Sequence, residues 1–192
     1  AFFRKAGRPG KARQIVADLL PAAAVEFAME YPVTTEIPLS DPRYAEILSA
    51  FYEICTARIR SLSEAGEDVI VLCEGDPFFY GSFMHLYRRL HTDYPVEVIP
   101  AITGMSAAWT ATGQPITWGD DTLSVLMGTL DEAELSKWFA ETDAAVVMKI
   151  GRNLQKIKRA LITVGRMEEA FMVECAAMPV SYTHLRAHET ET

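Results

Sequence analysis

The feature that most constrains the fold is a run of five apolar residues, Val69–Cys73, followed at once by the turn 74–77 (EGDP). A continuous run of this kind is typical of a strand buried on both faces, as in a parallel sheet. A second stretch, 96–100 (VEVIP), also predicts a strand, and helical patterns separate the strand-like segments. The sequence therefore predicts an α/β fold, in which helices cover a parallel sheet.

The clearest helix is expected to begin after Asp41, because an N-cap aspartate is followed there by Pro42, and to end near Gly66. The remaining pattern predicts helices over 10–20, 80–90, 103–112, 132–140 and 154–164, strands over 25–31, 122–127, 144–149 and 170–175, and an extended segment over 32–38. A loop rich in Gly and Pro, 113–120, is the best domain boundary. We therefore expect an N-terminal α/β domain over 1–112 and a C-terminal α/β domain over 117–178.

Both ends of the sequence look cut. The chain opens in mid-pattern on Ala1, and residues 179–192 lose the apolar rhythm and resemble a translated adaptor. We expect residues 179–192 to be a disordered tail that is not native.

Composition narrows the class of protein. The chain is 49% apolar with a net charge of -8, which repels a nucleic acid backbone, and no apolar run is long enough for a membrane span. Its three cysteines are widely spaced, which argues against a disulfide framework and a zinc site and suits the cytoplasm. The first fourteen residues run against the acidic average, because they hold five basic residues and no acid. This basic start could bind a small polyanion or could be a solvated helix face.

The best positions for a ligand follow the predicted strands, because ligands of α/β sheets bind at the carboxyl ends of strands. Small and polar residues occur there in four places: 74–81, 100–106, 127–129 and 148–153. Each has a plain structural explanation as well: Gly75 can make a tight turn, Thr103 can be an N-cap, and Lys149 can be a solvated strand end. Four such loops together favour a ligand cleft.

Several common sites are absent from the sequence. It holds no Gly-x-Gly for a dinucleotide or the usual methyltransferase loop, no Walker loop and no Gly-x-Ser-x-Gly elbow. Spacing alone therefore predicts an α/β ligand-binding protein and goes no further.

Three motifs carry a family resemblance: LCEGDPFFYGSF at 72–83, PVTTEIP at 32–38 and MKIGRN at 148–153. With the loop 100–106, they resemble the tetrapyrrole methylases, over roughly residues 2–178. In detail they are similar to the subgroup that methylates C20 of precorrin-2 or cobalt-precorrin-2 in cobalamin biosynthesis. The resemblance implies a homodimer of two-domain α/β subunits, with S-adenosylmethionine bound in a cleft between the domains. It also implies that the family's N-terminal strand and its Gly-x-Gly-Pro-Gly-Asp-Pro loop are missing here.

The resemblance also implies roles for individual residues. Lys149 is the candidate catalytic residue, as an electrostatic aid near the substrate. Arg8, Arg13 and Arg152 are candidate ligands for the carboxylates of the tetrapyrrole. The implied cofactor-binding residues are Glu74, Gly75, Asp76, Phe79, Thr103, Gly104, Met127 and Met148. No metal site is implied.

Two alternatives stay open. A related tetrapyrrole methylase would act at another ring carbon, and a truncated fragment would bind a ligand without turnover.

Overall fold

The computed structural model describes residues 1–33, 37, 41–176 and 182–184. The chain divides into two compact units, residues 1–101 and 102–192. Helix α4 (Gly104–Thr112) falls in the second unit, whereas the expected domain bounds, 1–112 and 117–178, placed it in the first. These expected bounds stay a prediction.

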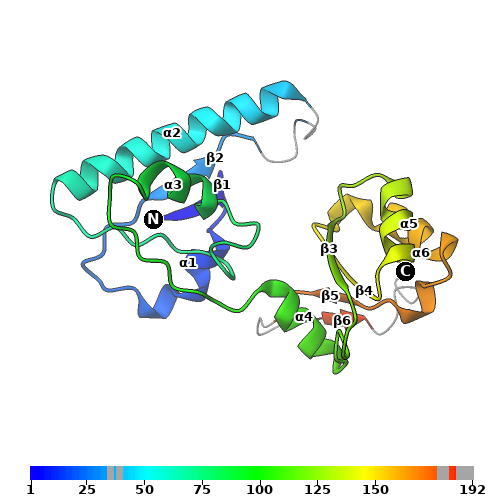
Figure 1. The fold of residues 1–192 in the computed structure, drawn as a ribbon. Coiled ribbons are helices and arrows are strands. Elements are labelled where there is room, and N and C mark those ends of the chain that lie inside the picture. Colours follow the sequence, from blue (N-terminus) through cyan, green and yellow to red (C-terminus); the bar gives the residue numbers. More distant parts are fainter. Residues whose placement is uncertain (34–36, 38–40, 177–181, 185–192) are drawn as a thin grey trace. The chain divides into compact units, whose positions relative to one another are not determined.

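The first unit is built on two parallel strands, β1 (Phe2–Lys5) and β2 (Ala28–Tyr31), paired in register from Phe2 opposite Ala28 to Lys5 opposite Tyr31. Its helices, seen in Figure 1, are α1 (Lys11–Ile15), the 3-10 helix η1 (Ala17–Leu19), α2 (Pro42–Glu64) and α3 (Phe83–Leu90). Strand β2 and helices α2 and α3 enclose one core, in which Met29 and Leu86 are fully buried.

The expected beginning and end of the long helix α2 are confirmed. The Asp41 side chain accepts a hydrogen bond from the backbone N–H of Arg43 over 3.0 Å, and Pro42 occupies the first turn. Gly66 follows the last turn with φ +82°, a conformation that costs glycine little. The buried residues Phe51, Cys55 and Ile59 recur at helical spacing and face the core.

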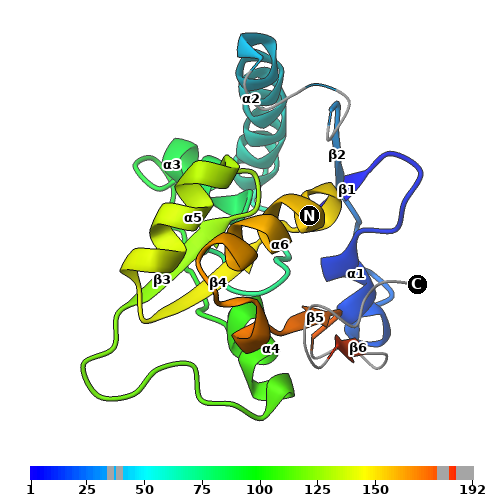
Figure 2. The same cartoon turned by 90° about the vertical axis from the view of Figure 1, so that its right-hand side faces the viewer.

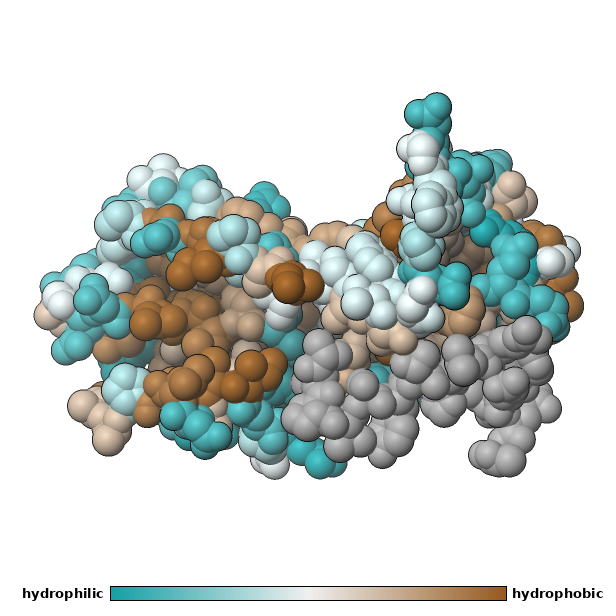
Figure 3. Space-filling model, turned by 90° about the horizontal axis from the view of Figure 1, so that it is seen from below, coloured by the Kyte–Doolittle hydropathy of each residue, from teal (hydrophilic) through white to brown (hydrophobic). Residues whose placement is uncertain are grey.

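The two expected strands 69–73 and 96–100 are wrong as strands. Only Leu72 forms a bridge, parallel to Phe2, and 96–100 pairs with no strand among the described residues. Burial of 69–73 on both faces is wrong too, because Ile70 is 72% exposed while its neighbours Val69 and Val71 pack against the core. A strand needs a hydrogen-bonded neighbour, which an apolar run does not supply. Figure 3 shows apolar residues gathered on one face of this unit.

Two further expected elements are shorter than predicted. The helix expected over 10–20 is only five residues long before it gives way to η1, and the consecutive β-branched residues Ile15 and Val16 disfavour its continuation. The strand expected over 25–31 begins at Ala28. Residues 34–36 and 38 of the expected extended segment lie outside the described residues.

The second unit pairs β3 (Leu123–Met127) in parallel with β4 (Ala144–Met148). Helices α5 (Glu132–Glu141) and α6 (Leu154–Thr163) lie alongside these strands, and Leu126, Leu135, Phe139, Ile157 and Ala160 form the core between them (Figure 2). The other elements are the 3-10 helices η2 (Gly151–Asn153) and η3 (Met167–Glu169) and the strands β5 (Met172–Glu174) and β6 (Tyr182–His184).

Strand β6 corrects part of the expectation for residues 179–192. It pairs antiparallel with β5, with Met172 opposite His184, so residues 182–184 are not a disordered tail. Backbone groups make this ladder, and they need no apolar rhythm in the sequence. Residues 179–181 and 185–192 lie outside the described residues.

Candidate functional site

The turn after residue 73 brings four of the expected cofactor-binding residues together: Glu74, Gly75, Asp76 and Phe79. Gly75 has φ +76°, so the turn has the left-handed conformation that favours glycine. The Phe79 N–H donates to the carbonyl of Asp76 over 3.2 Å, and the Phe79 ring meets the Tyr80 ring edge-on at 4.8 Å.

Asp76 ties this turn to the segment that ends at residue 101. Its Oδ1 accepts from the N–H of Phe78 over 2.9 Å, and its Oδ2 accepts from the N–H of Ala101 over 3.0 Å. The ends of the two expected strands therefore meet at one carboxylate, although neither segment forms a full strand. The carboxylate retains lone pairs that can accept from a further donor.

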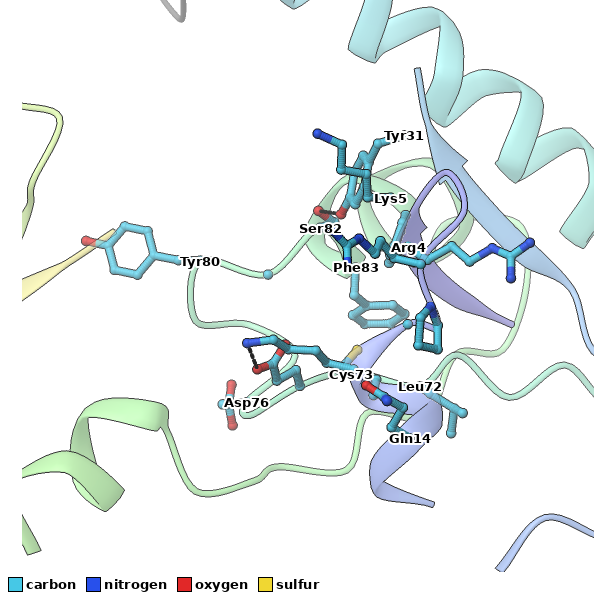
Figure 4. A pocket seen from close by; sticks show the side chains of 18 residues that line it. Arg4, Lys5, Gln14, Tyr31, Leu72, Cys73, Asp76, Tyr80, Ser82 and Phe83 are labelled. Carbon is cyan, nitrogen blue, oxygen red and sulfur yellow. Dashed lines mark hydrogen bonds and ion pairs between the residues drawn. The ribbon is translucent and has the colours of Figure 1, made fainter. Parts of the chain in front are cut away.

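A cavity of about 650 Å³ lies beside this turn within the first unit (Figure 4). Its walls come from β1, the segment 8–12 and the segment 72–83. Among the expected site residues, Arg8, Glu74 and Asp76 line the cavity, whereas Phe79 and Arg13 do not.

The basic start of the chain contributes most of the charge in this cavity. Arg4 Nε donates to Glu30 Oε1 over 2.8 Å, and Lys11 Nζ lies 3.7 Å from Glu74 Oε1. The Arg8 side chain has neither a hydrogen bond nor an ion pair with any residue that the structure describes. Arg8 is therefore the basic group of the cavity that is most available to an anionic ligand.

Arg13, the second expected carboxylate ligand, is engaged elsewhere. Its guanidinium binds both carboxylate oxygens of Glu26, over 2.8 and 3.0 Å. The hydrogen bond from Arg13 lowers the pKa of Glu26 and so favours its charged form. The structure thus separates Arg13 from Arg8, although the sequence grouped them.

Sequence reasoning missed the hydroxyl groups of this cavity. Tyr31 and Ser82 both line it and are hydrogen-bonded to each other, and the buried Tyr52 donates to Ser82 Oγ over 3.2 Å. Burial raises the pKa of Tyr31 to about 12, so the phenol stays protonated at neutral pH. Tyr31 ends a strand, so the rule that directed attention to strand ends could have found it.

The second unit holds the other expected residues at its own strand ends. Met127 and Met148 lie opposite each other in the last register position of β3 and β4, and both are half-buried. Lys149 follows directly, exposed, with a left-handed φ of +57° that is unusual for lysine. Arg152 is exposed in η2.

Thr103 and Gly104 begin helix α4. The Thr103 hydroxyl accepts from the N–H of Ser106 over 3.2 Å, so Thr103 is an N-cap as well as an expected cofactor ligand. Gly104 is exposed, and a Cβ there would meet nothing within 4 Å. The backbone at 104 is therefore open to approach by a ligand.

Other chemistries find little support. No group of three or more His, Cys, Asp or Glu gathers as a metal site in the part of the chain that the structure describes. Burial raises the pKa of Cys55 to about 11, which makes this thiol a poor nucleophile. No helix within the described ranges is long and apolar enough to cross a membrane.

A comparison with protein families matches residues 4–187 to the Tetrapyrrole (Corrin/Porphyrin) Methylases. The chain belongs to this family. The chain is 51% identical over 178 residues to a precorrin-2 C(20)-methyltransferase from Sinorhizobium sp, which covers 93% of the chain and 73% of that protein. It is 25% identical to a cobalt-precorrin-2 C(20)-methyltransferase from Salmonella typhimurium, over 98% of the chain and 77% of that protein.

Solved structures of this methylase family share the fold. Cobalt precorrin-4 methyltransferase CbiF matches with a TM-score of 0.68 at 17% identity, over 98% of the chain and 74% of CbiF. A uroporphyrin-III C-methyltransferase from Thermus thermophilus, complexed with S-adenosylhomocysteine, matches with a TM-score of 0.51 at 28% identity, over 71% of the chain and 64% of that enzyme. The expected α/β methylase fold is confirmed.

Proposed function

We propose that the chain transfers the methyl group of S-adenosylmethionine to C20 of precorrin-2 or cobalt-precorrin-2, a step of cobalamin biosynthesis. The observation that carries the proposal is the 51% identity with the Sinorhizobium enzyme over 93% of the chain. That match includes a site whose residue types suit both a sulfonium cofactor and an acidic tetrapyrrole.

The residues at the strand ends fit this cofactor. The left-handed turn at Gly75 and the open backbone at Gly104 allow close approach of a ligand. Asp76 has lone pairs left for an amine or a ribose hydroxyl, and the half-buried Met127 and Met148 offer apolar surface to an adenine ring. Glu74, Phe79 and Thr103 complete the proposed set.

The protein's task in methyl transfer is mainly alignment. When bound, S-adenosylmethionine supplies an electrophilic methyl group, so the chain's residues need to hold the ring carbon in line and exclude water. Lys149 is proposed as an electrostatic aid near the substrate, because it is exposed directly after β4. The proton that leaves the methylated carbon passes to water or to a weak base.

Charge supports the choice of an acidic substrate. Arg8 lines the cavity without a partner among the described residues and is the first proposed carboxylate ligand, with Arg152 as a second. Arg13 stays a prediction. The Arg13 guanidinium is paired with Glu26, and Arg13 does not line the cavity. Reversing the charge of Arg13 should therefore weaken tetrapyrrole binding less than reversing the charge of Arg8.

Calorimetry with S-adenosylhomocysteine tests the cofactor half of the proposal. We expect the wild-type chain to bind it, and the G75A variant to bind at least about tenfold more weakly, because alanine strains the left-handed turn. Gly66 is a matched control, since its φ of +82° is similar and it lies at the end of α2, away from the turn. Equal loss of affinity in G75A and G66A would point to a general loss of stability and would count against a cofactor site at Gly75.

Product analysis tests the substrate half. The chain is incubated anaerobically with precorrin-2 and isotope-labelled S-adenosylmethionine, and the labelled carbon is located by NMR. Label at C20 is the expected result. Label at another carbon would favour the alternative of a related methylase, and binding of both ligands without turnover would favour the alternative of a binding fragment.

The proposal includes a cytoplasmic homodimer, by similarity with the family. Light scattering of the purified chain tests the assembly, and a monomer at all concentrations would contradict it.

A further inference from the structure

Three hydroxyl groups form a hydrogen-bonded chain at the wall of the cavity. Tyr52, which is only 4% exposed, donates its single proton to Ser82 Oγ over 3.2 Å. Ser82 can then donate its own proton to the Tyr31 hydroxyl, to which it is hydrogen-bonded (Figure 4). This order leaves the proton of Tyr31 without an acceptor among the residues that the structure describes, at a position that lines the cavity.

The ring of Tyr31 is held firmly. The Phe3 ring stacks on it at 5.5 Å with an interplanar angle of 17°, and the Phe51 ring lies 5.3 Å away. Its phenol keeps its proton throughout the neutral range, because burial raises its pKa. Tyr31 is therefore a fixed hydrogen-bond donor, and little order remains to be imposed when a ligand accepts from it.

Positive charge lies next to this donor. Lys5 is opposite Tyr31 in the register of β1 and β2, on the same side of its strand as Phe3, whose ring stacks on Tyr31. Lys5 and Arg8 both line the cavity. Of the two acids that line it among the described residues, Glu74 faces Lys11 and Asp76 accepts two backbone N–H groups.

We propose that the Tyr31 hydroxyl donates a hydrogen bond to one carboxylate of the tetrapyrrole, in the cavity that Lys5 and Arg8 also line. Tyr31 is then a positioning residue: it selects which acidic side chain of the macrocycle enters this part of the cavity. The inference rests on the proposed function, since the ligand is taken to be a polycarboxylate. It predicts a loss of substrate affinity without loss of cofactor affinity when the hydroxyl is removed.

The Y31F variant of the full 192-residue chain tests this directly, because phenylalanine keeps the stacked ring. Anaerobic titration with precorrin-2, followed by quenching of the protein's fluorescence, should show binding weakened about 10- to 100-fold, the range for a hydrogen bond to a charged group. Affinity for S-adenosylhomocysteine and the unfolding midpoint should stay unchanged. The matched control is Y94F, whose hydroxyl donates to Glu64 over 2.7 Å and does not line the cavity.

A double-mutant cycle asks whether Tyr31 and Lys5 bind the same carboxylate. If they do, the loss in the Y31F/K5M double variant is smaller than the product of the two single losses, and K5R restores part of the affinity. Losses that simply multiply would overturn the shared carboxylate. If Y31F binds precorrin-2 within twofold of wild type, the donor role is refuted while the proposed function stands. If the wild-type chain binds neither ligand, the proposed function itself fails.

Discussion

Gly128 is a position at which the structure leaves too little room for a side chain. It follows β3, and its N–H donates to the carbonyl of Met148 over 2.7 Å. A Cβ at this position would lie 2.9 Å from the carbonyl oxygen of Lys149, 3.2 Å from that of Met148 and 3.1 Å from Cδ1 of Ile157. Two of these atoms are backbone, so they move only if the end of β4 moves. G128A should therefore destabilise the second unit.

The magnitude follows from the cost of overpacking. An extra methyl group forced into a well-packed site typically costs about 1–3 kcal/mol. For a unit of this size, each 1 kcal/mol lowers the melting temperature by about 4–8 °C. All three tryptophans, Trp109, Trp118 and Trp138, lie in residues 102–192, so tryptophan fluorescence follows unfolding of the second unit selectively. A decrease in melting temperature of at least about 4 °C is expected.

The matched control is G104A. Gly104 lies in the same unit at the first residue of α4, and a Cβ there would meet nothing within 4 Å. This variant should melt at or slightly above the wild-type temperature, because alanine favours the helix and restricts the unfolded chain. Identical melting of G128A and G104A would refute the reasoning, since the close approach of β4 would then impose no cost.

Three further predictions concern the first unit. T56V should raise the free energy of unfolding by about 1 kcal/mol, because the Thr56 hydroxyl is fully buried without a hydrogen-bond partner in the described chain, and a lower urea midpoint would contradict this. The pKa of Tyr31, about 12, exceeds that of an unfolded tyrosine, so its contribution to stability is complete below about pH 10 and is lost as pH rises to about 12. Spectrophotometric titration should lose its last phenol step in Y31F, and a step that persists would exclude Tyr31 as its source. D76A should lower both the urea midpoint and the affinity for S-adenosylhomocysteine, because it leaves the N–H groups of Phe78 and Ala101 without their acceptor. D76N should retain part of the stability and part of the affinity. Wild-type values in D76A would show that this carboxylate is dispensable.

Local signals in the sequence were enough to predict the long helix α2. Its capping aspartate, the proline after it and the glycine that ends it act within a few residues, so no distant contact is needed to place them. The same holds for Thr103, which caps α4 as its residue type suggests. These elements agree with the structure because their causes are local.

The segments 69–73 and 96–100 are cases in which local sequence signals predicted the wrong secondary structure. Their composition favours strands, but a strand exists only if a neighbour accepts and donates its hydrogen bonds. Only Leu72 meets such a neighbour, at Phe2. Apolar composition alone could not predict which edge would be paired.

The candidate site, like the fold, could be predicted from the sequence only in part. The rule that ligands bind at the ends of strands predicted positions such as Met127 and Met148, which the structure does place opposite each other. The pairing of Tyr31 with Ser82 joins residues 51 positions apart, through β2 and the start of α3, and no local pattern announces it. Charge alone likewise could not separate Arg8 from Arg13, because their difference is the presence of Glu26 beside one of them.

The contact between the first residues and Leu72 has a consequence for the order of folding. The Ala1 amino group donates to the carbonyl of Ile70 over 2.6 Å, and the Leu72 N–H donates to the carbonyl of Ala1 over 2.8 Å. Sixty-nine positions separate Ala1 from Ile70. During synthesis at about 5–20 residues per second, residues 1–2 therefore wait about 3–14 s for residues 70–72 to be made, whereas α2 can form as soon as it is made, and β2, the strand that pairs with β1, is made earlier still. In a ribosome-bound chain, helical structure should thus precede the pairing of residues 1–2 with 70–72.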